Sequence, residues 1–193
     1  MAVSFTVDTS TSMFRGWHLV DEPTMCPLAA FEKALAVEAN EKGGVWLTDA
    51  VENAQRYCRQ RIYAVGEYTA NRTMNIISLR TADDVQAFVD LYKCRHVEYL
   101  SGETGIECVS GTRYQVITNM IASMRDNFTP DYRGDHVFGK FFSKCVQDGD
   151  RCIDGFLRTS FASSQLASIV DEYYIISKNL LVLSSWKYMK DRP

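Results

Sequence analysis

The stretch DEYYII at residues 171–176 decides how this chain is interpreted, because it sets a carboxylate in front of an aromatic and β-branched run. Such a run is typical of a β-strand, and alternation of side chains along it places Val170, Glu172 and Tyr174 on one face. A carboxylate that faces a core or a cleft costs several kcal/mol of desolvation unless another group compensates it. Glu172 is therefore either a solvent-facing residue of an edge strand or an acid that takes part in chemistry.

Two earlier segments also hold a polar residue within an apolar run: FRGWH at residues 14–18 and VWLTD at residues 45–49. Arg15 carries a guanidinium, whose rigid fork matches phosphate oxygens, and the glycine after it lets a ligand approach the backbone. The hydroxyl of Thr48 could orient Glu172 or contact a ribose. An arginine, a hydroxyl and a carboxylate on separate strands could thus converge on one phosphate-bearing nucleotide sugar. The plain alternatives are a surface ion pair for Arg15 and a strand-end threonine at Thr48.

Two further residues are candidates for the same site. His18, on the same predicted strand as Arg15, could hydrogen-bond a ribose hydroxyl or a carboxamide, although a single histidine is more often structural. Tyr57, on the helix predicted after Thr48, could stack its ring on a flat heterocycle, although aromatic residues at helical spacing more often belong to a core. The acid Glu172 could stabilise an oxocarbenium-like centre while a glycosidic bond breaks, as carboxylates do in glycosidases.

Length and composition favour one α+β domain over residues 1–193. A chain of 193 residues with 46% hydrophobic content can bury one good core and is short for two. The Ser- and Thr-rich residues 1–12 are expected to form a loose lead-in. Strands are expected over residues 13–20, 45–47, 61–68, 71–79, 153–158, 170–177 and 180–185, and a Ser-rich loop over 159–168. Helices are expected over residues 28–40, 49–59, 81–92, 114–125 and 137–147.

Several functional classes are disfavoured by the sequence. The formal net charge of −3 gives no global attraction to nucleic acid. No apolar run reaches the roughly 18 residues of a membrane span, and residues 1–8 lack the features of a secretory signal. The six cysteines have no C-x-x-C spacing and are expected to be reduced thiols in a cytoplasmic compartment. The three histidines contain no i, i+4 pair, so no metal site is expected.

Taken in order, these segments resemble the ADP-ribosyltransferase superfamily. FRGWH resembles the first strand of that family, which supplies an Arg or a His for NAD, and GGVWLTDAVENAQRYC at 43–58 resembles its second strand and the helix after it. RIYAVGEY at 61–68 and MNIISL at 74–79 resemble the next pair of strands. DRCIDGFLR at 150–158 and DEYYIISKNLLVLSS at 171–185 resemble the closing strands, in which the catalytic glutamate opens an E-Y-hydrophobic run.

The resemblance implies a fold of split mixed or antiparallel sheets with flanking helices, and a site for NAD as substrate. It implies that Glu172 is the catalytic residue and acts with the 2′-hydroxyl of the nicotinamide ribose, which Thr48 supports. It implies that Arg15 or His18 is the first-strand ligand of NAD and that Tyr57 helps to wall the pocket. The implied activity is mono-ADP-ribosylation, in which nicotinamide leaves and a protein or nucleic-acid acceptor attacks the anomeric carbon.

Other interpretations stay open. Val170 stands where arginine-modifying members of the family carry a second glutamate, so arginine is not the expected acceptor. An NAD glycohydrolase would use the same site with water as acceptor. A non-catalytic binding module on this fold, or an unrelated α+β interaction protein, would need no such site. These interpretations are separated by whether Arg15, Thr48 and Glu172 face one cleft in the folded chain.

Overall fold

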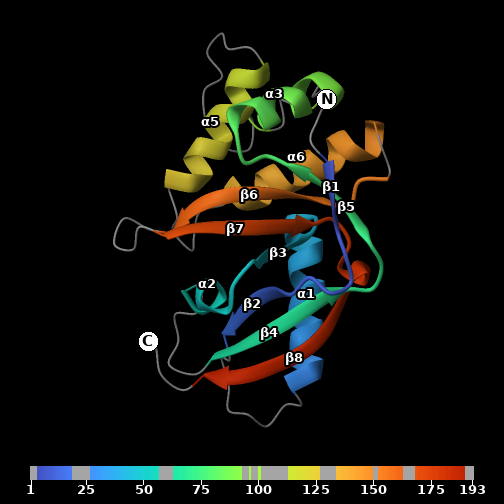
Figure 1. Cartoon of the computed structure of the whole chain (residues 1–193), viewed down its shortest axis with the longest axis vertical. Coiled ribbons are helices and arrows are strands. Elements are labelled where there is room, and N and C mark those ends of the chain that lie inside the picture. The colour runs from blue at the N-terminus through green and yellow to red at the C-terminus, as the bar shows by residue number, and fades with distance from the viewer. Residues whose placement is uncertain are drawn as a thin grey trace.

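The computed structural model of the chain is a mixed α+β structure in which helices flank one curled, eight-stranded sheet (Figure 1). It describes residues 4–18, 27–56, 63–92, 96, 100, 113–126, 134–149, 152–162 and 168–189. The α+β class predicted from the sequence is confirmed. Within the described ranges, no helix is both long and apolar enough to cross a membrane.

The sheet brings together strands that lie far apart in the sequence. The strands are β1 (Ser4–Val7), β2 (Met13–His18), β3 (Val45–Thr48), β4 (Tyr63–Ala70), β5 (Met74–Ser78), β6 (Gly155–Ala162), β7 (Ser168–Ile175) and β8 (Leu181–Met189). Their order is β1-β5-β6-β7-β3-β2-β4-β8, and all neighbours are antiparallel except the parallel pair β5 and β6. The strands that carry the three candidate polar residues, β2, β3 and β7, are therefore consecutive.

The helices cover both faces of this sheet. They are α1 (Pro27–Lys42), α2 (Val51–Arg56), α3 (Ala82–Tyr92), α5 (Arg113–Asp126) and α6 (Gly134–Gly149), with a short 3₁₀ helix, η1 (Lys178–Leu180). In Figure 1, α3, α5 and α6 gather beside β6 and β7, while α1 runs behind β2, β4 and β8. Helix α2 follows β3 directly and packs through Ala54 on Val65 of β4. The polar ends of β3 and β7 thus lie near α2.

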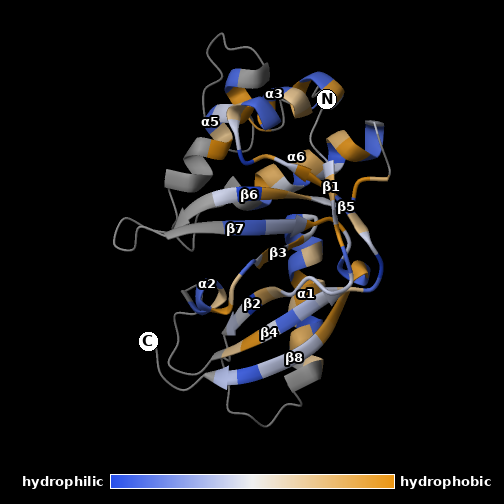
Figure 2. Ribbon diagram, in the orientation of Figure 1, coloured by the Kyte–Doolittle hydropathy of each residue, from blue (hydrophilic) through white to orange (hydrophobic). Residues whose placement is uncertain are grey.

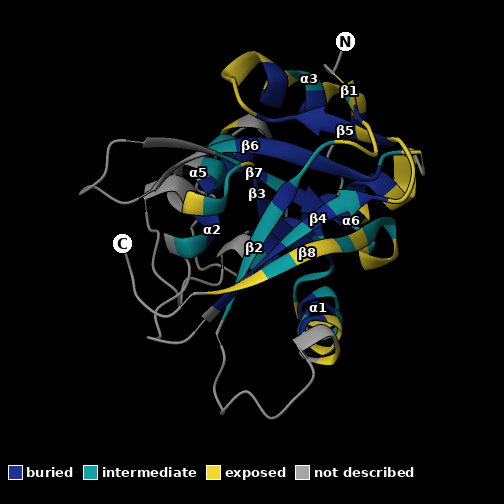
Figure 3. Cartoon of the chain, turned by 60° about the horizontal axis from the view of Figure 1, so that its bottom comes forward, coloured by how far each residue is buried: buried dark blue, intermediate teal, exposed yellow. Residues whose placement is uncertain are grey.

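Two hydrophobic cores lie on opposite faces of the sheet. In the first, α3, α5 and α6 pack on a row of cross-strand aromatic neighbours, Trp46, Tyr174 and Phe156, on β3, β7 and β6. The second core lies inside the curl, where Leu47 of β3 is in the same cluster as Tyr68 of β4. Trp46 and Leu47 serve different cores because successive strand residues point to opposite faces. Figure 2 shows apolar residues on β3 and β4, and Figure 3 shows a buried sheet interior with β8 largely accessible at the edge.

The sheet is nearly divided between β2 and β3. These strands share a single bridging pair, Phe14 with Thr48. Two residues before Thr48 on β3, the backbone of Trp46 bonds to side chains in place of β2. Its C=O accepts a hydrogen bond of 2.6 Å from Nη1 of Arg15, and its N–H donates to Oε1 of Glu38 on α1 at 3.4 Å. Side chains thereby satisfy backbone groups that an unbroken ladder would have paired. The predicted split sheets are thus one sheet with a narrow junction.

The N-terminal segment corrects one prediction. Residues 1–12 are not a loose lead-in throughout, because Ser4–Val7 forms β1 and pairs along its whole length with β5. Serine and threonine content suggested a loop, but Phe5 and Val7 alternate with polar residues as a strand requires. Val7 is 3% exposed and belongs to the core inside the curl. Burial against the sheet therefore stabilises a strand whose sequence gives only a weak strand signal.

The Ser-rich loop predicted over residues 159–168 is also wrong at both ends. Strand β6 continues to Ala162 and β7 begins at Ser168, which leaves residues 163–167 outside the described part. The other predicted elements are present with shifted ends, and residues 19–20 and 57–62 also lie outside the described part.

The first turn of α3 is fixed by Asp84. Its Oδ2 accepts hydrogen bonds from the Ser78 hydroxyl at 2.6 Å and from the backbone N–H groups of Arg80 and Thr81 at 3.2 and 3.1 Å. The Thr81 hydroxyl accepts the N–H of Asp84 at 3.1 Å, which completes a capping box with Asp in place of Glu. Burial by itself raises the pKa of Asp84, but these hydrogen bonds together lower it below its usual value.

We expect Asp84→Ala to lower the free energy of unfolding by about 1–3 kcal/mol, because three donors lose their acceptor. The exposed Asp83 in the same turn is the matched control, and Asp83→Ala should cost about 0.5 kcal/mol through the helix dipole. Because the folded pKa of Asp84 is lowered, its contribution is present above the unfolded pKa and is lost as pH falls through the folded one. Urea denaturation at several pH values measures both effects, and equal losses in the two variants would contradict the assignment.

Candidate functional site

Thr48 and Glu172 are direct neighbours across two strands. They are Cα partners in the antiparallel pair of β3 and β7, so their side chains lie on the same face of the sheet. Arg158 on β6 is the next partner in this row, opposite Glu172. Thr48 and Glu172 are each 4% exposed, and Arg158 is 2% exposed. A buried polar row therefore crosses β3, β7 and β6, two residues along from the aromatic row that begins at Trp46.

Arg158 and Glu172 form a buried ion pair. Nε and Nη2 of Arg158 both donate to Oε2 of Glu172, each at 2.7 Å. On its other side the guanidinium carbon lies 4.3 Å from the centroid of the Trp46 ring, which is a cation–π contact. The indole N–H of Trp46 is buried and has no acceptor among the described residues. The guanidinium is thus held between a carboxylate and an aromatic ring, away from water.

The hydroxyl of Thr48 donates within the backbone around it. It lies 3.3 Å from the C=O of Phe14 on β2 and 3.0 Å from the C=O of Ala50, just before α2. A hydroxyl has one proton, which these two carbonyls share, so toward a ligand the Thr48 oxygen is an acceptor. Thr48 therefore both closes the β2–β3 junction and offers lone pairs beside Glu172.

Glu172 is poised to change its charge near physiological pH. Burial raises its pKa to about 8, and the carboxylate of Asp49 adds to the effect. The guanidinium of Arg158 acts in the opposite sense, because a cation at hydrogen-bond distance favours the ionised carboxylate. In the neutral form the proton belongs on Oε1, since Oε2 accepts both N–H donors of Arg158. A carboxyl group with such a pKa suits acid–base or electrostatic work at neutral pH.

Arg15 lies on the opposite face of the sheet from this row. The residue of β2 that pairs with Thr48 is Phe14, and the residue after it in a strand points to the other side. The structure therefore brings Thr48 and Glu172 together on one face and places Arg15 on the other.

The side chain of Arg15 is engaged in closing the β2–β3 junction. Its Nη2 forms an ion pair with Oε2 of Glu38 on α1, while its Nη1 donates to the Trp46 C=O. Its guanidinium carbon lies 4.4 Å from the ring centroid of Trp17. Glu38 is only 4% exposed, and its buried carboxylate is compensated by two cations, Arg15 and Lys42, whose Nζ lies 3.3 Å from Oε1. Arg15 in this structure stabilises the fold, and a role in binding NAD would require it to leave Glu38.

The other two candidate residues, His18 and Tyr57, have side chains outside the described part of the chain. His18 ends β2 opposite Tyr63, and its side chain lies outside the described part of the chain. Tyr57 lies outside the described residues altogether. Their predicted contacts with NAD stay predictions.

Arg158 is not among the site residues predicted from the sequence, although the sequence holds a signal for it. Arg158 follows Phe156 by two residues in a short apolar strand, just as Glu172 precedes Tyr174 by two. Each charge therefore shares a strand face with a core aromatic residue. A lone charge at such a position predicts an oppositely charged partner. Which strand supplies that partner depends on the strand order, which the sequence does not give.

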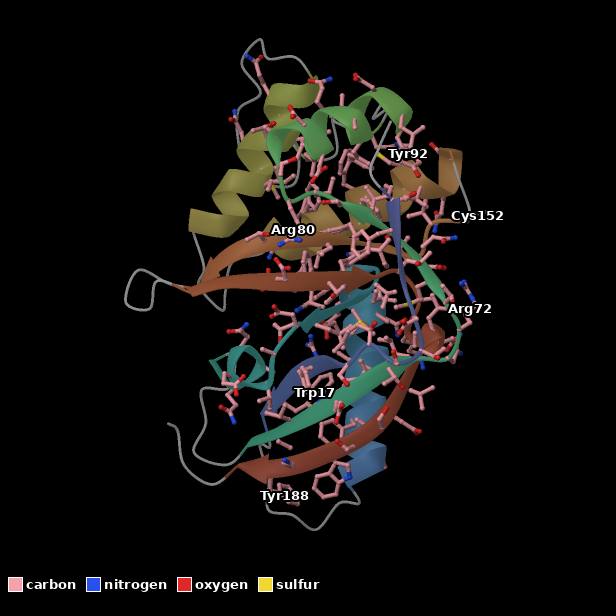
Figure 4. The ribbon with its side chains drawn as sticks, viewed as in Figure 1. Trp17, Arg72, Arg80, Tyr92, Cys152 and Tyr188 are labelled. Atoms are coloured by element: carbon pink, nitrogen blue, oxygen red, sulfur yellow. The ribbon has the colours of Figure 1, made fainter. Side chains whose placement is uncertain are left out.

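The acid next to Glu172 points away from the row. The Oδ1 atom of Asp171 accepts the Thr159 hydroxyl at 2.9 Å, and its Oδ2 lies 3.2 Å from Nη2 of Arg80. Figure 4 shows Arg80 beside β6 and β7. The Arg80 side chain is 48% exposed, so this ion pair contributes at most about 1 kcal/mol. Of the two acids in DEYYII, Glu172 alone belongs to the buried row.

No protein-family model matches this sequence, and no curated protein matches it. Across the described ranges, no group of three or more His, Cys, Asp or Glu residues is placed to hold a metal ion. The row of Thr48, Glu172 and Arg158 is therefore the feature from which a function can be inferred.

We expect the wild-type protein to lose stability relative to Glu172→Gln as pH rises from 4.5 to about 8. The folded pKa lies above the usual value, so in this window the native state keeps a proton that the unfolded chain releases. The amide has the same shape and does not titrate. Urea denaturation of both proteins at steps of pH should show their difference changing by several kcal/mol. A constant difference would mean that Glu172 titrates as an ordinary carboxylate.

We expect Arg15→Gln to destabilise the fold by about 1–3 kcal/mol, because the buried carboxylate of Glu38 loses a hydrogen-bonded cation and keeps Lys42, whose Nζ lies 3.3 Å from Oε1. The double variant Arg15→Gln/Glu38→Gln should recover part of this loss, since it also removes the buried charge that lost one of its two cations. Thermal or urea denaturation measures both. Unchanged stability together with lost NAD binding would instead identify Arg15 as a ligand.

Proposed function

We propose that the chain is an NAD-dependent mono-ADP-ribosyltransferase of the ADP-ribosyltransferase superfamily. It would cleave the bond between nicotinamide and ribose and transfer ADP-ribose to a protein or nucleic-acid acceptor. The observation that carries the proposal is the pairing of Thr48 with Glu172 on adjacent strands, at the single bridge between β2 and β3. These are the hydroxyl and the carboxylate that the sequence resemblance assigned to one site.

The proposed chemistry needs an anion beside the anomeric carbon. As the C–N bond breaks, its electron pair leaves with nicotinamide and positive charge develops on the ribose. An ionised Glu172 stabilises that charge and accepts a hydrogen bond from the 2′-hydroxyl. The acceptor then forms the new bond to the anomeric carbon and loses a proton. Thr48 beside Glu172 accepts a hydrogen bond from the ribose. In this proposal Arg15 keeps its structural place, and the cation of the site is Arg158.

A hydrolase would use the same residues with water as the acceptor. The polar row is identical for both reactions, so the two differ only in what approaches the anomeric carbon. Dependence of nicotinamide release on an added macromolecule separates them.

A second candidate is a non-catalytic binding module on this fold. The burial of Thr48 and Glu172, each 4% exposed, favours it, because a substrate reaches the carboxylate only after the site opens. Arg158 already neutralises Glu172 and could serve the fold alone. This candidate predicts a folded protein that releases no nicotinamide.

The test is nicotinamide release from NAD by purified protein, with and without a cell extract as acceptor source. We expect release by the wild type and a loss of at least about 100-fold in Glu172→Gln, because the amide cannot carry the charge. Release should increase as pH rises through about 8, where Glu172 ionises. Glu52→Gln, which alters an exposed carboxylate on the adjacent α2, is the matched control and should keep wild-type activity.

The results of this test distinguish transfer, hydrolysis and the binding module. Release that requires both Glu172 and the extract supports transfer, and release without extract supports hydrolysis. A folded wild type that releases no nicotinamide in either condition supports the binding module. Equal loss of activity in the Glu52 and Glu172 variants would remove the special role of Glu172.

A further inference from the structure

The guanidinium of Arg158 has two partners that together fix its plane. Below it, the Trp46 ring lies 4.3 Å from the guanidinium carbon. Beside it, both donating nitrogens meet the same oxygen of Glu172 at 2.7 Å. A planar cation that stacks on a buried ring and donates twice to one oxygen holds that oxygen in the plane of the guanidinium.

We propose that Arg158 is the positioning residue of the site, which holds Oε2 of Glu172 and so fixes the orientation of its carboxylate. This inference rests on the proposed function for its substrate, but the hold of Arg158 on Glu172 can be tested without NAD. Arg158 acts through Glu172 in this role and makes no bond to the reacting atoms.

Arginine suits this position better than lysine for two reasons. Its fork supplies two parallel N–H donors, whereas a lysine ammonium is a point charge with no preferred plane. It also keeps its charge when buried, while a buried lysine loses its proton more readily. A lysine at 158 should therefore preserve attraction to Glu172 and lose the orientation of its carboxylate.

The charged groups around Glu172 set the direction of the pH effect. Arg158 faces it from β6, and Asp49 follows β3, on the other side of β7. Glu52 on α2 is exposed to solvent. Among these described groups Arg158 is the cation. When Arg158 is replaced by a neutral residue, burial and the charge of Asp49 both still favour the neutral form of the Glu172 carboxyl. The pH at which Glu172 ionises should then move upward.

The first experiment follows the titration of Glu172 through stability. Wild type, Arg158→Gln and Arg158→Lys are each compared with their own Glu172→Gln derivative by urea denaturation from pH 5 to 10. The difference within each pair isolates the titration of Glu172. We expect the midpoint to rise by about one pH unit or more in Arg158→Gln and by less in Arg158→Lys.

Arg72→Gln is the matched control for this titration. Arg72 also donates twice to a carboxylate, that of Asp154, at 2.9 and 2.7 Å, but its side chain is 54% exposed. Its loss should leave the midpoint of Glu172 unchanged. An unchanged midpoint in Arg158→Gln would overturn the proposal. If Arg158→Gln does not fold, Arg158→Lys decides whether Arg158 holds Glu172, through the smaller shift of the Glu172 midpoint and through its kinetics.

The second experiment separates positioning from binding. In nicotinamide release from NAD, Arg158→Lys should lower kcat by about 10-fold or more and leave KM within about 3-fold, because the misoriented carboxylate acts in the transition state. A raised KM with unchanged kcat would make Arg158 a direct ligand of NAD and overturn the positioning role. A wild type without activity overturns the proposed function, whereas the stability titration still decides whether Arg158 holds Glu172.

Discussion

The fold depends on how the chain satisfies the backbone of Trp46, where β2 and β3 separate. A sheet that opens at its centre exposes N–H and C=O groups that are costly to leave unpaired. Here Glu38 accepts the N–H and Arg15 donates to the C=O, and the two side chains pair with each other. This interaction ties α1 to both strands at the junction. It lets one sheet curl into two halves without losing hydrogen bonds, and it explains why an arginine lies on this strand.

Trp46 also supports the second ion pair from its other side. Its backbone bonds to Arg15 and Glu38 at the junction, and its ring carries the guanidinium of Arg158. Two buried ion pairs thus lie close to one residue, with Arg15 and Arg158 coming from strands on either side of β3. Buried pairs are expensive to assemble and costly to break singly, so each fixes its surroundings in one arrangement. One pair holds the junction together, and the other places a carboxylate beside Thr48.

Burial gives the site its chemistry and also limits access to it. The pKa of Glu172 is raised because its carboxylate is removed from water, and a substrate must reach that same carboxylate. An enzyme can meet both needs if the elements beside the row move when substrate binds, which excludes water at the reacting atoms. A binding module needs no such movement. The difference between the two candidates is therefore one of access, since the polar row would be the same in both.

The sequence by itself determined most strands and helices, because apolar periodicity and Gly, Asp and Thr signals act over short distances. It also singled out Glu172 and Thr48 as polar residues in apolar strands. It did not determine strand order, so it missed Arg158 as the partner of Glu172 and could not show that Arg15 lies on the other face from Thr48 and Glu172. It missed β1 because the burial of Val7 comes from β5 and the curl of the sheet. Partners across strands, faces and pKa shifts are set by residues far apart in the chain, so only the tertiary structure decided them.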